Sequence, residues 1–261
     1  MPTLDLATAP DTRFDTRFDP RRFAPISEAA FFFDVDGTLL DLRERPDDVV
    51  ADSALRALLS ALADASDGAV ALVSGRSLAD LDRIFDPLRL PCAALHGATI
   101  RFPNGAVQPP PKGAMDRARP DVTRYVADRP GLMLEDKGAT LAVHYRQRPE
   151  LGADLVAYLS DFGPGRDLAV QEGKLVVELK PTGADKGRAI AALMRHAPFA
   201  GRTPAFFGDD LTDEDGFGFV NSVGGVSCRI GLADAPTQAR LHLPDPAAMR
   251  ATLRVLVGAL T

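Results

Sequence analysis

The stretch that decides the fold is Phe31-Phe32-Phe33-Asp34-Val35-Asp36-Gly37-Thr38-Leu39. Three consecutive aromatic residues predict the end of a strand that is buried on both faces, as in the middle of a parallel sheet. Side chains alternate along an extended chain, so Asp34 and Asp36 should point to the same side. Ligands of open α/β sheets bind beyond the carboxyl ends of the strands, and two acids that repel each other there require a cation or a shared proton. The stretch therefore predicts a central strand that ends in an active site.

The composition is that of an ordinary globular chain. Its 261 residues are 46% hydrophobic and 25% charged, which allows one substantial core or a core with a smaller second domain. The net charge of −6 argues against nucleic acid or an anionic membrane as the main partner, while a small anionic substrate stays open. No secretory signal or membrane-spanning apolar stretch is visible, and Cys92 and Cys228 lack metal-ligand spacing. We expect a cytoplasmic protein with two buried thiols.

Strand and helix patterns alternate at both ends of the chain. Buried strands are expected at about 29–34, 69–73, 92–95 and 205–207. Helices are expected near 50–65, from about Ser77, which suits an N-cap, and from about Lys186. This alternation predicts an α/β fold with a parallel, doubly wound sheet. Residues 1–27 are polar and contain prolines, and we expect a weakly ordered arm that packs by its phenylalanines.

The pattern changes after Gln108-Pro109-Pro110-Pro111, the strongest linker signal in the chain. Two hairpin-like units follow, with helices expected near 120–129 and 150–162. Residues 174–180 alternate polar and apolar, which predicts an antiparallel sheet with one buried and one solvated face. We therefore expect three parts: the arm at 1–27, a core formed by 28–110 and 182–261, and a smaller α+β insert at 111–181.

Four places that end a strand or begin a helix carry chemically useful side chains. They are Asp34 with Asp36, Ser74, Lys186, and the acidic run from Gly208 to Asp215. Each alone has a simpler interpretation, as a turn residue, a helix cap, a solvated lysine or acids at a helix start. Lysine is scarce, with 5 of the 30 basic residues, and we expect Lys112 and Lys180 to be merely exposed. All four places together, on one α/β core, favour a catalytic site.

Their order resembles the haloacid-dehalogenase (HAD) superfamily of phosphatases. The matching strings are Asp-Val-Asp-Gly-Thr at 34–38, Val-Ser-Gly-Arg at 73–76, Lys186, and Gly-Asp-Asp-Leu-Thr-Asp-Glu at 208–214. The resemblance implies a HAD-like core in which Asp34 attacks phosphorus to form an aspartyl-phosphate. Asp36 would be the general acid for the leaving alcohol and then the base for the hydrolytic water. Ser74 and Lys186 would hold the phosphoryl oxygens.

The same resemblance implies Mg²⁺ as the cofactor, an ion that prefers oxygen ligands. Asp34, the main-chain carbonyl of Asp36 and Asp209 would bind it, while Asp210 and Asp213 would orient its waters. Other residues are then expected at the substrate or at the loop that holds it: Thr38, Gly75, Arg76 and His96.

Strings in and near the insert resemble the trehalose-6-phosphate phosphatase family more specifically. They are Leu95-His96-Gly97-Ala98, Leu134-Glu135-Asp136-Lys137, Val143-His144-Tyr145-Arg146 and Glu172-Gly173-Lys174-Leu175-Val176-Val177-Glu178. The resemblance implies Mg²⁺-dependent hydrolysis of trehalose 6-phosphate, with the insert as a cap that closes over the sugar. The sugar-binding residues would be Glu135, Lys137, His144, Arg146, Lys174 and Glu178. His144 and Arg146 would share one strand, and a mixed charged surface suits the hydroxyls of a disaccharide.

Three alternatives stay open. A related capped phosphatase would act on sucrose phosphate, a mannosyl phosphate or another sugar phosphate. A catalytically silent sugar-phosphate sensor would share the fold, although the presence of Asp34, Asp36, Lys186 and Asp209 argues against it. The third alternative concerns the charged residues of the insert. Instead of binding sugar, they would form the solvated face of a half-buried sheet, with cross-strand ion pairs. Because the insert would already cover the site, a monomer is compatible with the sequence.

Overall fold

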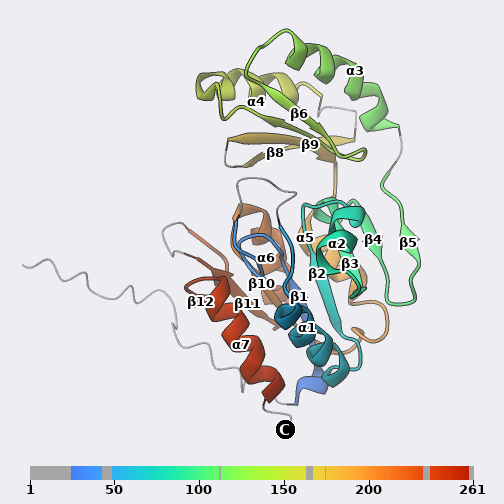
Figure 1. Ribbon diagram of the computed structural model, residues 1–261. Helices are drawn as coiled ribbons and strands as arrows, with labels where there is room; N and C mark the ends of the chain where they lie inside the picture. Colours follow the sequence, from blue (N-terminus) through green and yellow to red (C-terminus); the bar gives the residue numbers. More distant parts are fainter. Residues whose placement is uncertain are drawn as a thin grey trace, which may run out of the picture.

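The computed structural model describes residues 25–42, 49–111, 113–162, 167–173, 175–231 and 236–258. They form one sheet of eight strands and one of four (Figure 1). The strands of the large sheet are β1 (Ala29–Phe33), β2 (Val70–Val73), β3 (Cys92–Ala94), β4 (Thr99–Arg101), β5 (Val107–Gln108), β10 (Thr203–Gly208), β11 (Val226–Ile230) and β12 (Leu241–Leu243). Most of the expected arm, residues 1–24, lies outside the described residues.

The large sheet has the strand order β12-β11-β10-β1-β2-β3-β4-β5. The pairs from β12 to β3 are parallel, which confirms the expected parallel sheet with β1 in its interior. Strands β4 and β5 extend it in antiparallel fashion at one edge, an extension that was not predicted. They have only three and two residues, too few to show a period of two in the sequence.

Helices cover both faces of this sheet, so the fold is doubly wound. On one face lie α1 (Ser53–Ala65), α2 (Leu78–Phe85) and α7 (Pro246–Gly258), and on the other lie α5 (Lys186–Leu193) and α6 (Glu214–Ser222). Phe31 and Phe33 pack with the first set and Phe32 with the second, and all three are fully buried. The three aromatic residues of β1 thus serve two hydrophobic cores, because successive side chains of a strand point to opposite faces.

The insert forms the small antiparallel sheet, in the order β6-β7-β9-β8. Its elements are α3 (Ala114–Ala127), β6 (Met133–Asp136), β7 (Leu141–His144), α4 (Gly152–Ser160), β8 (Leu168–Gly173) and β9 (Val176–Pro181). Figure 1 shows α3 and α4 on the side that faces away from the large sheet. The first helix begins at Ala114 rather than near 120, so Pro120 lies inside it, although proline favours the first turn of a helix. Among the described residues, no helix has the length and apolar character needed to cross a membrane.

The polar face of β9 differs from the expectation of a solvated surface. Glu178 and Lys180 on this face are only 6% and 9% exposed. Lys180 donates a hydrogen bond to the Gln171 side chain, so the expectation that it is an exposed lysine was wrong. The alternation of β9 identified its two faces correctly, but the core covers the face that was expected to meet water.

Lys112 lies outside the described residues, and the thiols of Cys92 and Cys228 are free and buried as expected.

Candidate active site

A cavity of about 480 Å³ lies between the carboxyl edge of the large sheet and the small sheet. The core lines it with Asp34, Asp36, Gly75, Arg76, His96, Lys186, Asp209 and Asp210, and the insert lines it with Glu135, Lys137 and His144. Leu42, Val49, Asp80, Val176 and Thr212 line it too and were not predicted. This volume is typical of a small-molecule site. The tertiary structure therefore brings most of the expected residues to one cavity.

A buried lysine joins two aspartates at the bottom of the site. Lys186, the first residue of α5, is 2% exposed, and its Nζ lies 2.8 Å from Asp34 Oδ1 and 2.6 Å from Asp213 Oδ1. Asp34 follows β1 directly and is 5% exposed. One cation thus faces two carboxylates in a site from which water is largely excluded, so charge–charge interactions there are strong.

Burial and neighbouring carboxylates both raise the pKa values of Asp34 and Asp209. Burial raises the pKa of Asp34 well above its usual value, and Asp213 and Asp209 raise it further against the opposing effect of Lys186. Burial also raises the pKa of Asp209, to about 7, with Asp213 as the next cause. Burial alone would lower the pKa of Lys186, but Asp213 and Asp34 outweigh it and raise that pKa. A further positive charge would therefore stabilise the ionised carboxylates.

The acidic cluster fits a divalent metal ion. Carboxylate oxygens of Asp34, Asp209 and Asp213 lie within 4.8 Å of one another. Hard oxygen ligands of this kind suit Mg²⁺, and its charge would relieve the mutual repulsion that raises their pKa values. Asp213 differs from the other two because it is fully buried and already accepts hydrogen bonds on both oxygens, from Lys186 and from the backbone N–H groups of Asp209 and Asp210.

Gly37 makes room for the Asp209 carboxylate. Its φ is +79°, and a Cβ at this position would lie 2.1 Å from Asp209 Oδ2. Real Cβ atoms do not tolerate such a distance, so a side chain at position 37 would displace the carboxylate. The adjacent Thr38 is fully buried, and its hydroxyl lies 3.4 Å from Asp209 Oδ1. The loop after β1 is thereby fitted to the loop after β10.

Asp36 lies on the same cavity but has a different partner. The Arg76 guanidinium donates from Nε to Asp36 Oδ2 at 2.6 Å and from Nη2 to Oδ1 at 2.7 Å. This bidentate pair is the strong, geometrically specific form of an arginine–carboxylate contact. The two acids of the opening stretch are thus separated in their surroundings, one paired with a buried lysine and one with an arginine at the cavity wall.

The loop after β2 packs against a turn that follows β3. Ser74 is 1% exposed, its Oγ accepts the Arg76 N–H at 3.2 Å, and it is not among the residues that line the cavity. Gly75 lies under the ring of His96, where a Cβ would be 2.5 Å from Nε2. The glycine of this loop therefore admits the imidazole. As expected, Ser77 caps α2 and accepts the N–H of Asp80 at 3.1 Å.

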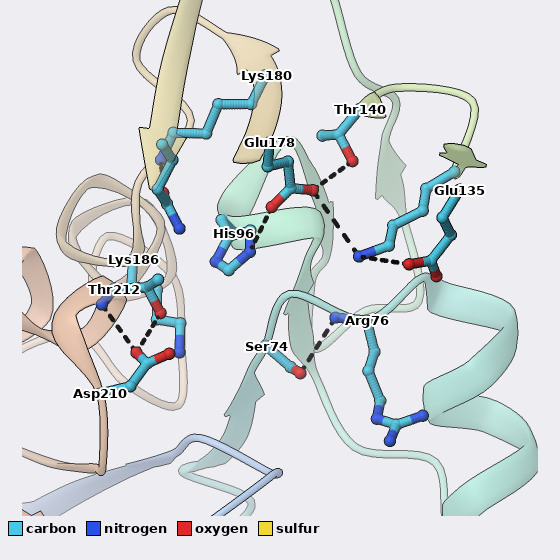
Figure 2. A network of polar contacts seen from close by, with 12 residues as sticks. Ser74, Arg76, His96, Glu135, Thr140, Glu178, Lys180, Lys186, Asp210 and Thr212 are labelled. Carbon is cyan, nitrogen blue, oxygen red and sulfur yellow. Dashed lines mark hydrogen bonds and ion pairs between the residues drawn. The ribbon is translucent and has the colours of Figure 1, made fainter. Parts of the chain in front are cut away.

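The acidic loop after β10 is ordered by its own side chains. Asp210 accepts hydrogen bonds from the N–H and the hydroxyl of Thr212 at 2.8 and 2.6 Å (Figure 2). Gly208 leaves room for Asp213, since a Cβ there would lie 2.2 Å from Asp213 Cγ. These local contacts help to fix the carboxylates of this loop next to Lys186.

The insert contributes a connected set of charged side chains. Glu135 on β6 accepts from His144 on β7 at 3.0 Å, and its Oε2 lies 3.9 Å from Lys137 Nζ. Lys137 is also 3.8 Å from Oε1 of Glu178 on β9. The hydrogen bond with His144 lowers the pKa of Glu135 despite partial burial. Glu135, Lys137 and His144 thus present a mixed acidic and basic surface to the cavity.

Three other expected sugar-binding residues lie elsewhere or outside the description. The strand that carries His144 ends there, and Arg146 follows in a turn with an exposed side chain, so the two do not share a strand as expected. Glu178 is 6% exposed and, like Arg146, is not among the residues that line the cavity. Lys174 lies outside the described residues. Thr140, which sequence reasoning missed, is fully buried and donates to Glu178 at 2.6 Å; no spacing in the chain signals this contact.

Comparison with known proteins gives a consistent result. The family model for trehalose-phosphatase matches residues 32–247. The chain is 46% identical over 223 residues to trehalose-6-phosphate phosphatase of Escherichia coli K12, covering 83% of each protein. It is 41% identical over 230 residues to a probable trehalose-phosphate phosphatase of Sinorhizobium fredii, covering 87% of each.

Solved structures show the same fold. The C-terminal domain of C. albicans trehalose-6-phosphate phosphatase superimposes with a TM-score of 0.80 at 23% identity, over 94% of this chain and 99% of that chain. A haloacid dehalogenase-like hydrolase from Bacteroides thetaiotaomicron gives a TM-score of 0.65 at 15% identity, over 87% and 99%. At these identities the likeness concerns the fold alone, and it confirms the expected HAD-like architecture with a smaller inserted unit.

Proposed function

The chain belongs to the trehalose-phosphatase family, and on that premise we propose that it hydrolyses trehalose 6-phosphate to trehalose and phosphate. The observation that carries the proposal is one cavity with two unlike walls. The core wall has the acids and the lysine needed for phosphoryl transfer, and the insert wall has charged groups suited to a sugar with many hydroxyls.

In the proposed first step, an Asp34 oxygen attacks phosphorus and the bond from phosphorus to the sugar oxygen breaks. Asp36 gives its proton to that oxygen, so trehalose leaves as a neutral alcohol and Asp34 carries the phosphoryl group. Lys186, 2.8 Å from Asp34, balances the negative charge that would otherwise repel an anionic substrate. Arg76 holds both Asp36 oxygens, and the substrate phosphate would compete for this guanidinium and free the acid.

In the proposed second step, water attacks the phosphoryl group of Asp34 and gives a proton to Asp36. The bond from phosphorus to Asp34 breaks, which releases inorganic phosphate and restores both acids. Ser74 and Thr38 would support the phosphoryl oxygens and the loop that carries them. When bound, Mg²⁺ would be held by Asp34, the Asp36 carbonyl and Asp209, with Asp210 and Asp213 behind them, and would supply charge neutralisation.

We assign phosphoryl transfer and sugar binding to different proposed domains. The core at 28–110 and 182–261 would carry out phosphoryl transfer, and the insert at 111–181 would act as a cap. Glu135, Lys137 and His144 would contact the sugar, because they line the cavity from the insert side. Contacts from Arg146 and Lys174 remain predictions from sequence.

Released phosphate, measured on a panel of sugar phosphates with Mg²⁺ and with a chelator, tests the proposal. We expect trehalose 6-phosphate to have the highest kcat/KM and the chelator to abolish turnover. A wide preference for sucrose phosphate or a mannosyl phosphate would overturn the substrate, and no Mg²⁺-dependent release from any substrate would overturn the enzyme.

Replacing the nucleophile separates catalysis from binding. Asp34→Asn should abolish turnover while binding of the substrate largely survives, because the change removes the attacking oxygen and keeps the shape. Asp64→Asn, at an exposed position of α1, is the matched control and should retain wild-type kinetics. Undiminished turnover in Asp34→Asn would show that another group attacks phosphorus.

A further inference from the structure

Glu214 joins two parts of the core beside the acidic loop. It is the first residue of α6, directly after Asp213, and its side chain is 18% exposed. Its Oε1 accepts a hydrogen bond from the Thr237 hydroxyl at 2.6 Å, and its Oε2 accepts the Gln238 N–H at 2.7 Å. The Gln238 side chain donates to the Glu214 carbonyl at 3.2 Å. These hydrogen bonds fasten the segment before β12 to the first turn of α6.

The same carboxylate faces a buried arginine. Arg229 on β11 is 7% exposed, and its Nη1 lies 3.6 Å from Glu214 Oε1. Its Nε and Nη1 are buried and have no hydrogen-bond partner among the residues that the structure describes. Removing one partner of a buried ion pair is strongly unfavourable, because the other charge is left uncompensated. Glu214 therefore supplies the charge that balances Arg229.

Arg229 lies next to the strand that leads into the acidic loop. It is paired across the sheet with Gly208, the residue before Asp209, and neighbouring strands are about 5 Å apart. A Cβ on Gly208 would lie 2.2 Å from Asp213 Cγ, so position 208 projects toward Asp213. Paired residues of neighbouring strands project to the same face of a sheet. The Arg229 side chain thus leaves the sheet on the face that carries Asp213 and Glu214.

The start of α6 also fixes the acidic loop. Asp213 accepts the backbone N–H groups of Asp209 and Asp210 at 2.9 and 3.1 Å, and it accepts a hydrogen bond from Lys186 at 2.6 Å. Because Asp213 directly precedes Glu214, a shift of the first turn of α6 would move the Asp213 carboxylate. Groups that orient metal ligands from behind are worth about 10–100-fold in metal affinity. The position of this turn therefore matters for a cation bound at Asp209.

We infer that Glu214 is a positioning residue for the acidic loop: it holds the segment 237–239, balances Arg229, and so keeps Asp213 and Asp209 placed to bind a divalent cation. It acts through Asp213, since it is not among the residues that line the cavity. The inference rests on the proposed function for the role of the cation, but binding of a cation can be measured without turnover.

Binding of Mn²⁺ to the full chain, followed by electron paramagnetic resonance without substrate, tests this role. Mn²⁺ prefers the same oxygen ligands as Mg²⁺, and its free form gives the signal. In Glu214→Ala the dissociation constant should rise about tenfold, because Asp213 loses its support and Arg229 its counter-ion. Thr237→Val keeps the shape of its side chain and removes only the hydroxyl, so it is a milder test that does not depend on the folding of Glu214→Ala. It should raise the constant about threefold, the effect of one hydrogen bond.

Asp82→Ala is the matched control for a general loss of stability. Asp82 on α2 lies 2.6 Å from Arg101 on β4, whose side chain is only 15% exposed, and neither residue lines the cavity. Asp82→Ala should lower the midpoint of urea unfolding but leave the Mn²⁺ dissociation constant within about twofold of the wild type. An equal rise in Asp82→Ala, or wild-type Mn²⁺ binding in Thr237→Val and in folded Glu214→Ala, would overturn the inference.

A double variant tests the balance of charge. Glu214→Gln keeps the length of the side chain but not its charge, and it should raise the Mn²⁺ dissociation constant about tenfold. Adding Arg229→Met removes the uncompensated cation, so the constant should return to within about threefold of the wild type. A double variant that binds Mn²⁺ no better than Glu214→Gln would overturn the role given to Arg229.

Phosphate release gives a second readout. In Glu214→Ala the Mg²⁺ concentration for half-maximal activity should rise about tenfold, while kcat at saturating Mg²⁺ stays within about threefold of the wild type. A loss of kcat that excess Mg²⁺ does not restore would mean that Glu214 acts on the chemical step and would overturn the inference. Failure of the wild type to release phosphate would instead count against the proposed function, and Mn²⁺ binding would still decide the role of Glu214.

Discussion

The fit between Gly37 and Asp209 gives a sharp prediction, because the chain supplies its own control. A Cβ at position 37 would lie 2.1 Å from Asp209 Oδ2 and 2.5 Å from Asp209 Cγ. Gly105 has nearly the same φ, +81° against +79°, but nothing lies within 4 Å of the Cβ it would carry. The substitutions Gly37→Ala and Gly105→Ala therefore impose the same backbone strain and differ in whether a carboxylate must move.

The expected magnitudes follow from these distances. Both alanines should lower the free energy of unfolding by about 1–2 kcal/mol, the cost of a left-handed L residue. In Gly37→Ala the Asp209 carboxylate must in addition move by about 1 Å to reach ordinary van der Waals contact. A displacement of this size at a catalytic group costs roughly 100-fold in rate. We expect kcat/KM to fall about 100-fold in Gly37→Ala and to stay at the wild-type value in Gly105→Ala.

Two assays decide the matter. Urea titration measures the stability of both variants, and phosphate release from trehalose 6-phosphate at increasing Mg²⁺ measures activity and metal dependence. The concentration of Mg²⁺ for half-maximal activity should rise about tenfold or more in Gly37→Ala, since Asp209 is a proposed ligand. The reasoning is refuted if Gly37→Ala, like Gly105→Ala, keeps wild-type activity and metal dependence.

Two further predictions concern Arg76 and the acidic cluster. Arg76→Lys should lower kcat/KM at least about tenfold, because lysine cannot make the bidentate contact to Asp36; Arg124→Lys on the surface of α3 is the control, and equal activity of the two variants would contradict the role of the pair. In a chelator, the free energy of unfolding should fall by about 4 kcal/mol as the pH rises from about 4 to about 7. The reason is that burial, with Asp213, raises the pKa of Asp209 to about 7, so the folded state keeps a proton that the unfolded state releases. In urea titrations at several pH values, the free energy of unfolding should fall less with pH in Asp209→Asn than in the wild type. The same dependence on pH in both proteins would be evidence against Asp209 as the origin.

Much of the fold could be predicted from short stretches of the sequence. The aromatic run before Asp34 identified the interior strand, because a strand that buries three consecutive phenylalanines must be covered on both faces. Ser77 was recognised as a helix cap because its hydroxyl can satisfy a free backbone N–H at the first turn. The proline-rich linker and the change of period predicted the insert. These features depend on a few neighbouring residues, so the sequence determined them by itself.

The partners of charged side chains were decided by the tertiary structure. Alternation along β9 showed that Glu178 and Lys180 share a face, but a period of two cannot tell whether water or another domain covers that face. The pairing of Asp36 with Arg76, 40 residues away, and the fit of Gly75 under His96 likewise depend on how separate loops converge at the sheet edge. The sequence alone therefore determined which residues could do the chemistry and on which elements they lie. Long-range packing decided which of them face the cavity, because burial and electrostatic environment are properties of the assembled surfaces.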